Sequence, residues 1–182
     1  MKIVETPIKD LLIIEPSVFD DDRGYFYESF NKERFLKNDL EYDFVQDNQS
    51  FSSYGTIRGL HLQIGEFAQA KLVRCPVGKV LDVAVDLRVG SETFGQSFSI
   101  ELSEENHRQL LIPRNFAHGF SVLSKNALFQ YKCDNFYNKE SERGIIYSDS
   151  TLSIDWQVEE DKISLSEKDK LLPTYNEYCE RL

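Results

Sequence analysis

The chain has 182 residues, 41% of them hydrophobic, and a formal net charge of −10 at pH 7. This length and apolar content are typical of a single globular domain with its own core, and they exclude a disordered chain. The acidic balance argues against general binding to nucleic acid or to an anionic membrane, because both need a basic surface. It still allows a small anionic ligand held by a few arginines.

The three cysteines, Cys75, Cys133 and Cys179, are too few and too far apart for a disulfide framework or a Cys-x-x-Cys zinc site. They favour a reduced, cytoplasmic setting. The apolar run at residues 11–14 is too short for a signal peptide or a membrane span. We therefore expect a cytoplasmic protein without a membrane segment.

In chain order, the first predicted element is a short helix over residues 32–37, which Asn31 is placed to cap. Strands are then predicted at residues 70–75, 79–87, 96–102, 108–112, 119–123, 128–133 and 144–147, with turn signals between them. In the clearest strand, one predicted face holds Leu81, Val83, Val85 and Leu87, and the other holds Asp82, Ala84 and Asp86. Ser166 and Asp169 begin a helix-capping pattern. Short, regularly spaced strands predict an antiparallel all-β sandwich or barrel with short peripheral helices.

The motif inventory excludes several classes. No G-x-G-x-x-G, Walker or G-x-S-x-G motif is present. Metal-binding cupins usually supply two histidines one residue apart, but Gln63 stands two residues after His61. His118 stands alone and His107 lies in a polar run, so we expect no catalytic metal.

The most informative stretch is Arg58-Gly59-Leu60-His61-Leu62-Gln63, which precedes Lys71. Cations near an imidazole favour its neutral form, which can accept a proton. They can also bind the anion that remains when a proton is removed beside a carbonyl. From the motif alone, a core histidine that binds a backbone carbonyl is an equally good interpretation.

A wider resemblance favours catalysis. Residues 22–28, Asp-Arg-Gly-Tyr-Phe-Tyr-Glu, resemble the D-x-R-G-x-F-x-E signature of the dTDP-4-dehydrorhamnose 3,5-epimerase family. Further similar segments follow in the family's order, at residues 46–48, 58–63, 71–74, 82–88, 112–120, 131–132, 154–156 and 165–169. The resemblance runs from about residue 3 to about residue 173, nearly the whole chain.

The resemblance implies one jelly-roll (cupin-like) β-sandwich domain over residues 1–182 that works as a homodimer without cofactor or metal. The family converts dTDP-4-dehydro-6-deoxy-D-glucose to dTDP-4-dehydro-L-rhamnose, for dTDP-L-rhamnose, by inverting C3 and C5 beside the C4 ketone. We therefore expect an isomerase that binds a dTDP-4-keto-6-deoxyhexose. The N-terminal strands, at about residues 1–30, would be exchanged with the partner subunit, and a C-terminal helical segment would cover about residues 166–182.

By the same resemblance, His61 is the base, Asp169 orients it, Tyr131 donates a proton on the opposite face and Lys71 holds the enolate oxygen. Each also has an ordinary structural interpretation: Asp169 fits the capping pattern, and a strand tyrosine or lysine usually packs or faces solvent. The alternation places Tyr131 on the interior side of its strand.

The remaining expected contacts concern the nucleotide sugar. Arg23 and Glu28 would reach the diphosphate and base in the partner's site, and Phe136 stands where the family often stacks a tyrosine on the thymine. The full set of expected substrate-binding residues is Arg23, Glu28, Gln46, Asn48, Arg58, His118, Phe136, Glu142 and Lys168.

Alternative functions stay open at this point. A relative that inverts only C3 would use the same His61 and Tyr131. A non-catalytic nucleotide-sugar binding module would keep the ligand contacts without the chemistry. A metal-dependent cupin oxygenase has the least support.

Overall fold

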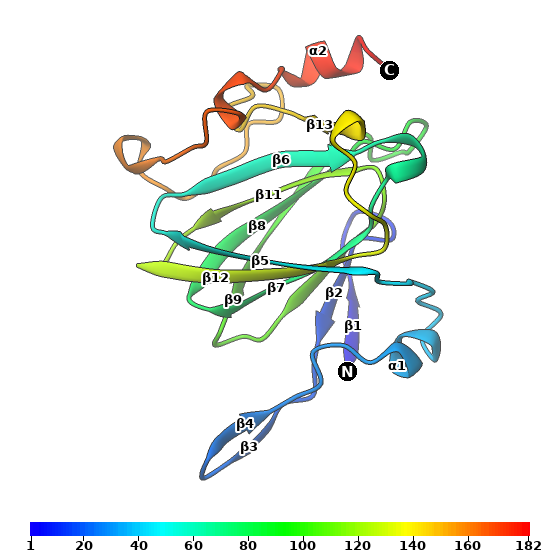
Figure 1. Ribbon diagram of the computed structural model, residues 1–182, viewed down its shortest axis with the longest axis vertical. Helices are drawn as coiled ribbons and strands as arrows, with labels where there is room; N and C mark the ends of the chain where they lie inside the picture. Colours follow the sequence, from blue (N-terminus) through cyan, green and yellow to red (C-terminus); the bar gives the residue numbers. More distant parts are fainter.

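The computed structural model describes residues 1–182 as two antiparallel sheets that face each other in a sandwich (Figure 1). The six-stranded sheet has the order β1 (Lys2–Glu5), β2 (Leu12–Glu15), β10 (Gln109–Ile112), β7 (Lys71–Val77), β12 (Asn126–Cys133) and β5 (Gln46–Ser53). The five-stranded sheet has the order β13 (Glu142–Gly144), β6 (Ile57–Gln63), β11 (Phe116–Val122), β8 (Lys79–Asp86) and β9 (Ser97–Ser103). The predicted sandwich is therefore confirmed.

Helices are short and peripheral, as predicted. They are α1 (Lys32–Leu36), α2 (Tyr175–Cys179) and 3-10 turns at Gly65–Phe67, Lys139–Ser141, Glu160–Lys162 and Asp169–Leu171. The Asn31 side chain caps α1 by accepting a hydrogen bond from the Arg34 backbone N–H, and α1 buries Phe35. No helix in the structure has the length and apolar content needed to cross a membrane.

The interior of the sandwich is apolar over much of its length. Its core includes Val73, Leu110, Phe116, Phe120 and Phe129. The rings of Phe120 on β11 and Phe129 on β12 stack with centroids 4.1 Å apart, so this aromatic pair joins the two sheets. Burial of such side chains contributes about 1.5–3 kcal/mol each.

Strand β8 has the two faces that the alternation predicted, and both are buried. Its predicted apolar face packs against residues 145–179, including Trp156 and Tyr178, which cover the outside of the five-stranded sheet (Figure 1). The opposite face is buried as well: Ala84 lies in the sandwich core, and Asp82 and Asp86 are fully buried. The reason is that β8 lies inside its sheet and is covered on both sides.

The last predicted strand, at residues 144–147, is also shifted. The strand β13 ends at Gly144, and Ile146 then donates a hydrogen bond to the Pro173 carbonyl in the covering C-terminal segment.

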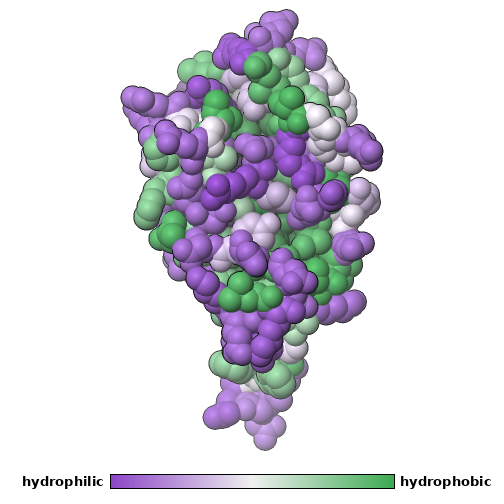
Figure 2. Space-filling view, turned by 90° about the vertical axis from the view of Figure 1, so that its right-hand side faces the viewer, coloured by the Kyte–Doolittle hydropathy of each residue, from purple (hydrophilic) through white to green (hydrophobic).

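A two-stranded hairpin, β3 (Phe19–Asp21) and β4 (Gly24–Phe26), projects from the body of the molecule (Figure 1). It exposes the large side chains of Phe19 (62%) and Phe26 (66%). Figure 2 shows the same projection as a narrow lower end on which hydrophobic residues lie among hydrophilic ones. Exposed apolar side chains on a projecting element are typical of an interaction surface. The N-terminal strands themselves pair within the chain, β1 with β2 and β2 with β10.

Candidate active site

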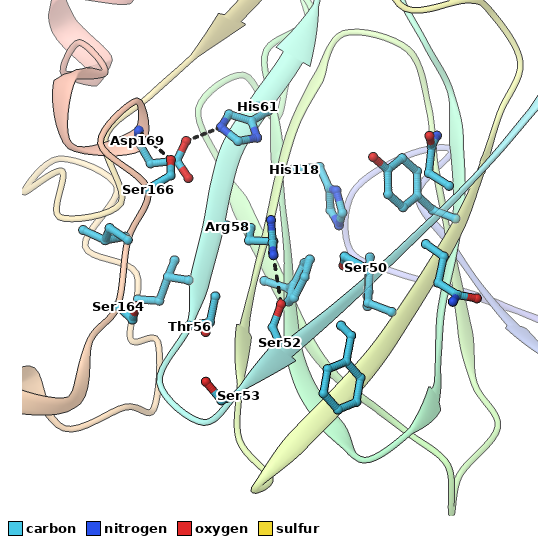
Figure 3. A pocket seen from close by; sticks show the side chains of 18 of the residues that line it. Ser50, Ser52, Ser53, Thr56, Arg58, His61, His118, Ser164, Ser166 and Asp169 are labelled. Atoms are coloured by element: carbon cyan, nitrogen blue, oxygen red, sulfur yellow. Dashed lines mark hydrogen bonds and ion pairs between the residues drawn. The ribbon is translucent and has the colours of Figure 1, made fainter.

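A cavity of about 820 Å³ opens between the two sheets (Figure 3). The edge strand β5 contributes polar side chains to its wall, among them Asn48, Ser50 and Ser52 at alternate positions of the strand. The lining side chains that carry charge or can exchange a proton are Arg58, His61, Lys71, His118, Tyr131, Lys168 and Asp169.

Two glycines allow the strands that carry both histidines to lie close together. A Cβ atom on Gly59 would lie 2.6 Å from the His118 carbonyl oxygen, and one on Gly119 would lie 2.7 Å from the Arg58 carbonyl oxygen. Gly59 also has φ +118°, a conformation that side chains rarely adopt. The resulting register sets His61 on β6 opposite His118 on β11.

The central interaction is between His61 and Asp169, whose Nε2 and Oδ1 atoms lie 2.6 Å apart (Figure 3). The Asp169 side chain is only 4% exposed. Burial raises the pKa of this carboxyl, but hydrogen bonds from His61, Ser166 and the Gly59 backbone outweigh it, and the net pKa is lowered. Asp169 therefore stays ionised beside the imidazole. The Asp169 backbone also donates to Ser166 Oγ at 3.1 Å, so the capping interaction coexists with the pair.

A second histidine–aspartate pair lies deeper. His118 Nε2 is 2.9 Å from Asp82 Oδ2, and both residues are buried. Burial lowers the pKa of His118, and the Asp82 carboxylate offsets only part of this effect. The other carboxylate oxygen, Asp82 Oδ1, is buried without a hydrogen-bond partner. Sequence reasoning did not single out Asp82, although its position between two hydrophobic residues in a predicted strand is a signal of burial.

Lys71 and Tyr131 reach the cavity from the six-stranded sheet, on β7 and β12. Burial lowers the pKa of Lys71, because its ammonium is poorly solvated. An oxyanion bound beside it would stabilise the charged form. Burial raises the pKa of Tyr131, so its phenol keeps its proton and can act as a donor. Tyr131 packs against the sandwich interior near Phe129, on the side that the alternation predicted.

Arg58 is fixed by a residue that the sequence did not indicate. Its Nε donates to Ser52 Oγ at 3.1 Å, across the cavity wall between β6 and β5 (Figure 3). This hydrogen bond orients the guanidinium along the cavity.

A smaller cavity of about 320 Å³ shares Asn48, His61, Lys71 and Tyr131 with the first. It is also lined by Gln46, Gln63, Gln69, Tyr137 and Glu142. Gln46 donates to Asn48 at 2.9 Å. Burial raises the pKa of Glu142, but Lys168 Nζ at 2.6 Å and the Tyr137 hydroxyl at 2.9 Å more than offset it, so the net pKa is lowered.

The expected contact of Phe136 with the thymine stays a prediction, and in the single chain Phe136 and Tyr137 lie differently relative to the cavities. Phe136 is 62% exposed and lines neither cavity, whereas Tyr137 lines the smaller one. The loop turns the two rings in different directions, and only the backbone path decides which of them faces inward.

Two further expected contacts lie outside both cavities of the chain. Arg23 lies at the hairpin turn, where it pairs with Asp21 at 2.5 Å. Glu28 pairs with Arg34 at 2.9 Å. The single chain therefore brings together His61, Lys71, Tyr131 and Asp169 with six of the nine expected binding residues, but not Arg23, Glu28 or Phe136.

No three His, Cys, Asp or Glu side chains are grouped in a way that would hold a metal ion. Gln63 stands where metal-binding cupins carry a second histidine, and its amide is occupied by backbone groups.

Fold and site together define a jelly-roll β-sandwich enzyme whose cavity holds a histidine–aspartate pair and a partly buried tyrosine. A family model described as dTDP-4-dehydrorhamnose 3,5-epimerase matches residues 5–177, and the chain belongs to this family.

Known relatives agree over almost the whole chain. The dTDP-4-dehydrorhamnose 3,5-epimerase of Escherichia coli K12 is 52% identical over 97% of this chain and 96% of its own. The crystal structure of the enzyme of that name from Elizabethkingia anophelis is 59% identical, with a TM-score of 0.93 and 97% coverage of both chains. A Legionella pneumophila structure in complex with dTDP-4-keto-L-rhamnose is 49% identical, with a TM-score of 0.92, and covers 96% of this chain and 93% of that one.

Proposed function

We propose that this protein converts dTDP-4-dehydro-6-deoxy-D-glucose to dTDP-4-dehydro-L-rhamnose by inverting C3 and C5. One observation carries the mechanism: His61 Nε2 lies 2.6 Å from the buried Asp169 carboxylate, in a cavity that Tyr131 enters from the other sheet. Membership of the family and the sugar nucleotide bound by the Legionella relative support the choice of substrate.

Proton removal is the first step. Both inverted carbons are next to the C4 ketone, so loss of a proton gives an enolate. His61 takes the proton, and the imidazolium that forms is stabilised by Asp169 at hydrogen-bond distance. Lys71 binds the enolate oxygen, because its poorly solvated ammonium gains most from the negative charge that develops there.

Proton return must occur on the opposite face of the sugar ring if the carbon is to be inverted. His61 belongs to the five-stranded sheet and Tyr131 to the six-stranded sheet, so the two groups approach a ring bound between the sheets from opposite sides. Tyr131 carries a proton because burial raises its pKa. After the first inversion His61 holds the proton that it removed and Tyr131 has lost one. Both groups return to their starting states by exchanging protons with solvent, and the same pair can then act at the second carbon.

We also propose that residues 1–182 form one epimerase domain that works as a homodimer in the cytoplasm. The projecting hairpin supports the dimer, since it carries Arg23 and the exposed Phe19 and Phe26 away from the chain's own cavity. In the dimer Arg23 and Glu28 would reach the nucleotide of the partner. Light scattering tests this, because a monomer in solution would remove any role for Arg23 in the site.

The test of the reaction is an NMR time course of dTDP-4-dehydro-6-deoxy-D-glucose in D₂O, followed at C3 and C5. We expect deuterium at both carbons, and we expect His61→Ala to abolish exchange while dTDP binding persists. Exchange at C3 alone would assign the protein to the C3-only epimerases. Binding of dTDP without exchange at either carbon would indicate a binding module.

A further inference from the structure

Gln63 is buried two residues after His61 on the same face of β6, and only 4% of it is exposed. Its Nε2 donates to the carbonyls of Phe67 at 2.8 Å and Phe136 at 3.0 Å, and its Oε1 accepts from the Asn138 backbone N–H at 2.5 Å. Both amide protons and the oxygen are thus used. A buried amide satisfied in this way holds its partners in one arrangement, because breaking any of the bonds leaves a polar group unpaired.

The backbone that Gln63 holds carries the side chains at the mouth of the smaller cavity. Tyr137 lies between the two loop residues bonded to Gln63, and Glu142 pairs with Gln63 in register where β13 meets β6. The Tyr137 hydroxyl donates to Glu142 Oε2 at 2.9 Å.

The same contacts lead back to the base. Lys168 Nζ lies 2.6 Å from Glu142 Oε2, and the next residue, Asp169, holds His61. These contacts therefore connect Gln63 to His61, both on β6, through the loop and the Glu142–Lys168 ion pair. In this set of contacts, Gln63 is the residue that binds the backbone of a loop rather than a neighbouring side chain.

We infer that Gln63 is a positioning residue for the nucleotide end of the epimerase site, acting through Tyr137 and Glu142. This inference rests on the proposed function. An aromatic ring with a hydroxyl, beside a carboxylate paired with a lysine, offers stacking, hydrogen bonds and positive charge to a pyrimidine nucleotide. Without the hydrogen bonds of Gln63, the loop that holds Tyr137 would become ordered only when the ligand binds. The entropy cost of this ordering would weaken ligand binding but would not change the proton transfer at His61.

The experiment compares wild type, Gln63→Met and a matched control, Asn106→Leu. Met keeps the length of Gln but cannot make its hydrogen bonds. Asn106 also bonds three backbone groups, in the loop between β9 and β10, and lies outside both cavities. We measure the Kd of dTDP by calorimetry, kcat and KM for the keto sugar by NMR, and the thermal midpoint of each protein.

We expect Gln63→Met to raise the Kd of dTDP and the KM about tenfold and to leave kcat within about twofold. Asn106→Leu should lower the thermal midpoint without changing either binding constant. A Kd for dTDP unchanged in folded Gln63→Met would overturn the inference, and so would a loss of kcat at constant KM. If wild type binds dTDP but does not exchange C3 or C5 protons, the proposed function fails, while the effect of Gln63 on dTDP binding is still measured.

Discussion

Replacement of Asp169 by asparagine tests the pair at the centre of the mechanism. The carboxylate lies 2.6 Å from His61 Nε2 and is 4% exposed, so water cannot take its place when the imidazole becomes charged. A hydrogen bond to a charged group contributes about 1.5–3 kcal/mol, and a neutral one about 0.5–1.5 kcal/mol. The amide of the Asp169→Asn variant would keep at most the neutral bond. The middles of the two ranges differ by about 1 kcal/mol, so the barrier should rise by about that amount and kcat should fall about fivefold.

The assay is the initial rate of deuterium incorporation at C3 and C5 under saturating substrate. Asp149→Asn is the matched control, because Asp149 is also buried and accepts backbone hydrogen bonds from Thr151, Leu152 and Tyr175 outside the cavity. It should lose stability and keep kcat. A folded Asp169→Asn enzyme with kcat within about twofold of wild type would refute the proposed role of the carboxylate.

Four further results are expected. Tyr131→Phe should reduce the rate of inversion about 10²–10³-fold, while His61 still exchanges the C3 proton with solvent. NMR measures the two rates separately. An equal loss of inversion and of exchange would contradict the assignment of Tyr131 as proton donor only. Lys71→Met should lower kcat about 10²–10³-fold with little change in KM, and an effect confined to KM would show that the lysine only binds. Gly59→Ala should destabilise the fold by about 2 kcal/mol or more in urea unfolding, because its Cβ would collide with the His118 carbonyl. The pKa of Asp169 in the folded protein lies below its ordinary value of 3.8. Its contribution to stability is therefore present above pH 3.8 and is lost as the pH falls through the folded pKa. In urea titrations below pH 3.8, wild type should lose more stability than Asp169→Asn.

The strands that sequence reasoning found are those with a strong apolar period, β7 to β12. It missed β5 because alternate positions of that strand are Gln46, Asn48, Ser50 and Ser52, which line the two cavities instead of a core. A hydrophobic period cannot reveal a strand whose inward face is polar.

The site was only partly accessible from the residues alone. His61 could be singled out from its neighbours in the chain, but Asp169 is 108 residues away, and only the family resemblance joined them. Asp82 was missed because β8 is covered on both sides: residues 145–179 cover its apolar face, and the face that holds Asp82 lies in the sandwich interior. Which of Phe136 and Tyr137 faces the smaller cavity depends on the direction of a loop, which spacing does not encode.

The stacked rings of Phe120 and Phe129 have a consequence for stereochemistry. They bridge the same two sheets that carry the base and the acid, and they line the same cavity. The stacked rings therefore help to set the distance between the two sheets, and with it the distance between His61 and Tyr131. If the sheets were further apart, the enolate would be within reach of one of these groups only. The carbon would then recover its proton on the side from which the proton was lost. If His61 and Tyr131 act as proposed, these two hydrocarbon rings help to decide whether the carbon is inverted, although they exchange no proton themselves.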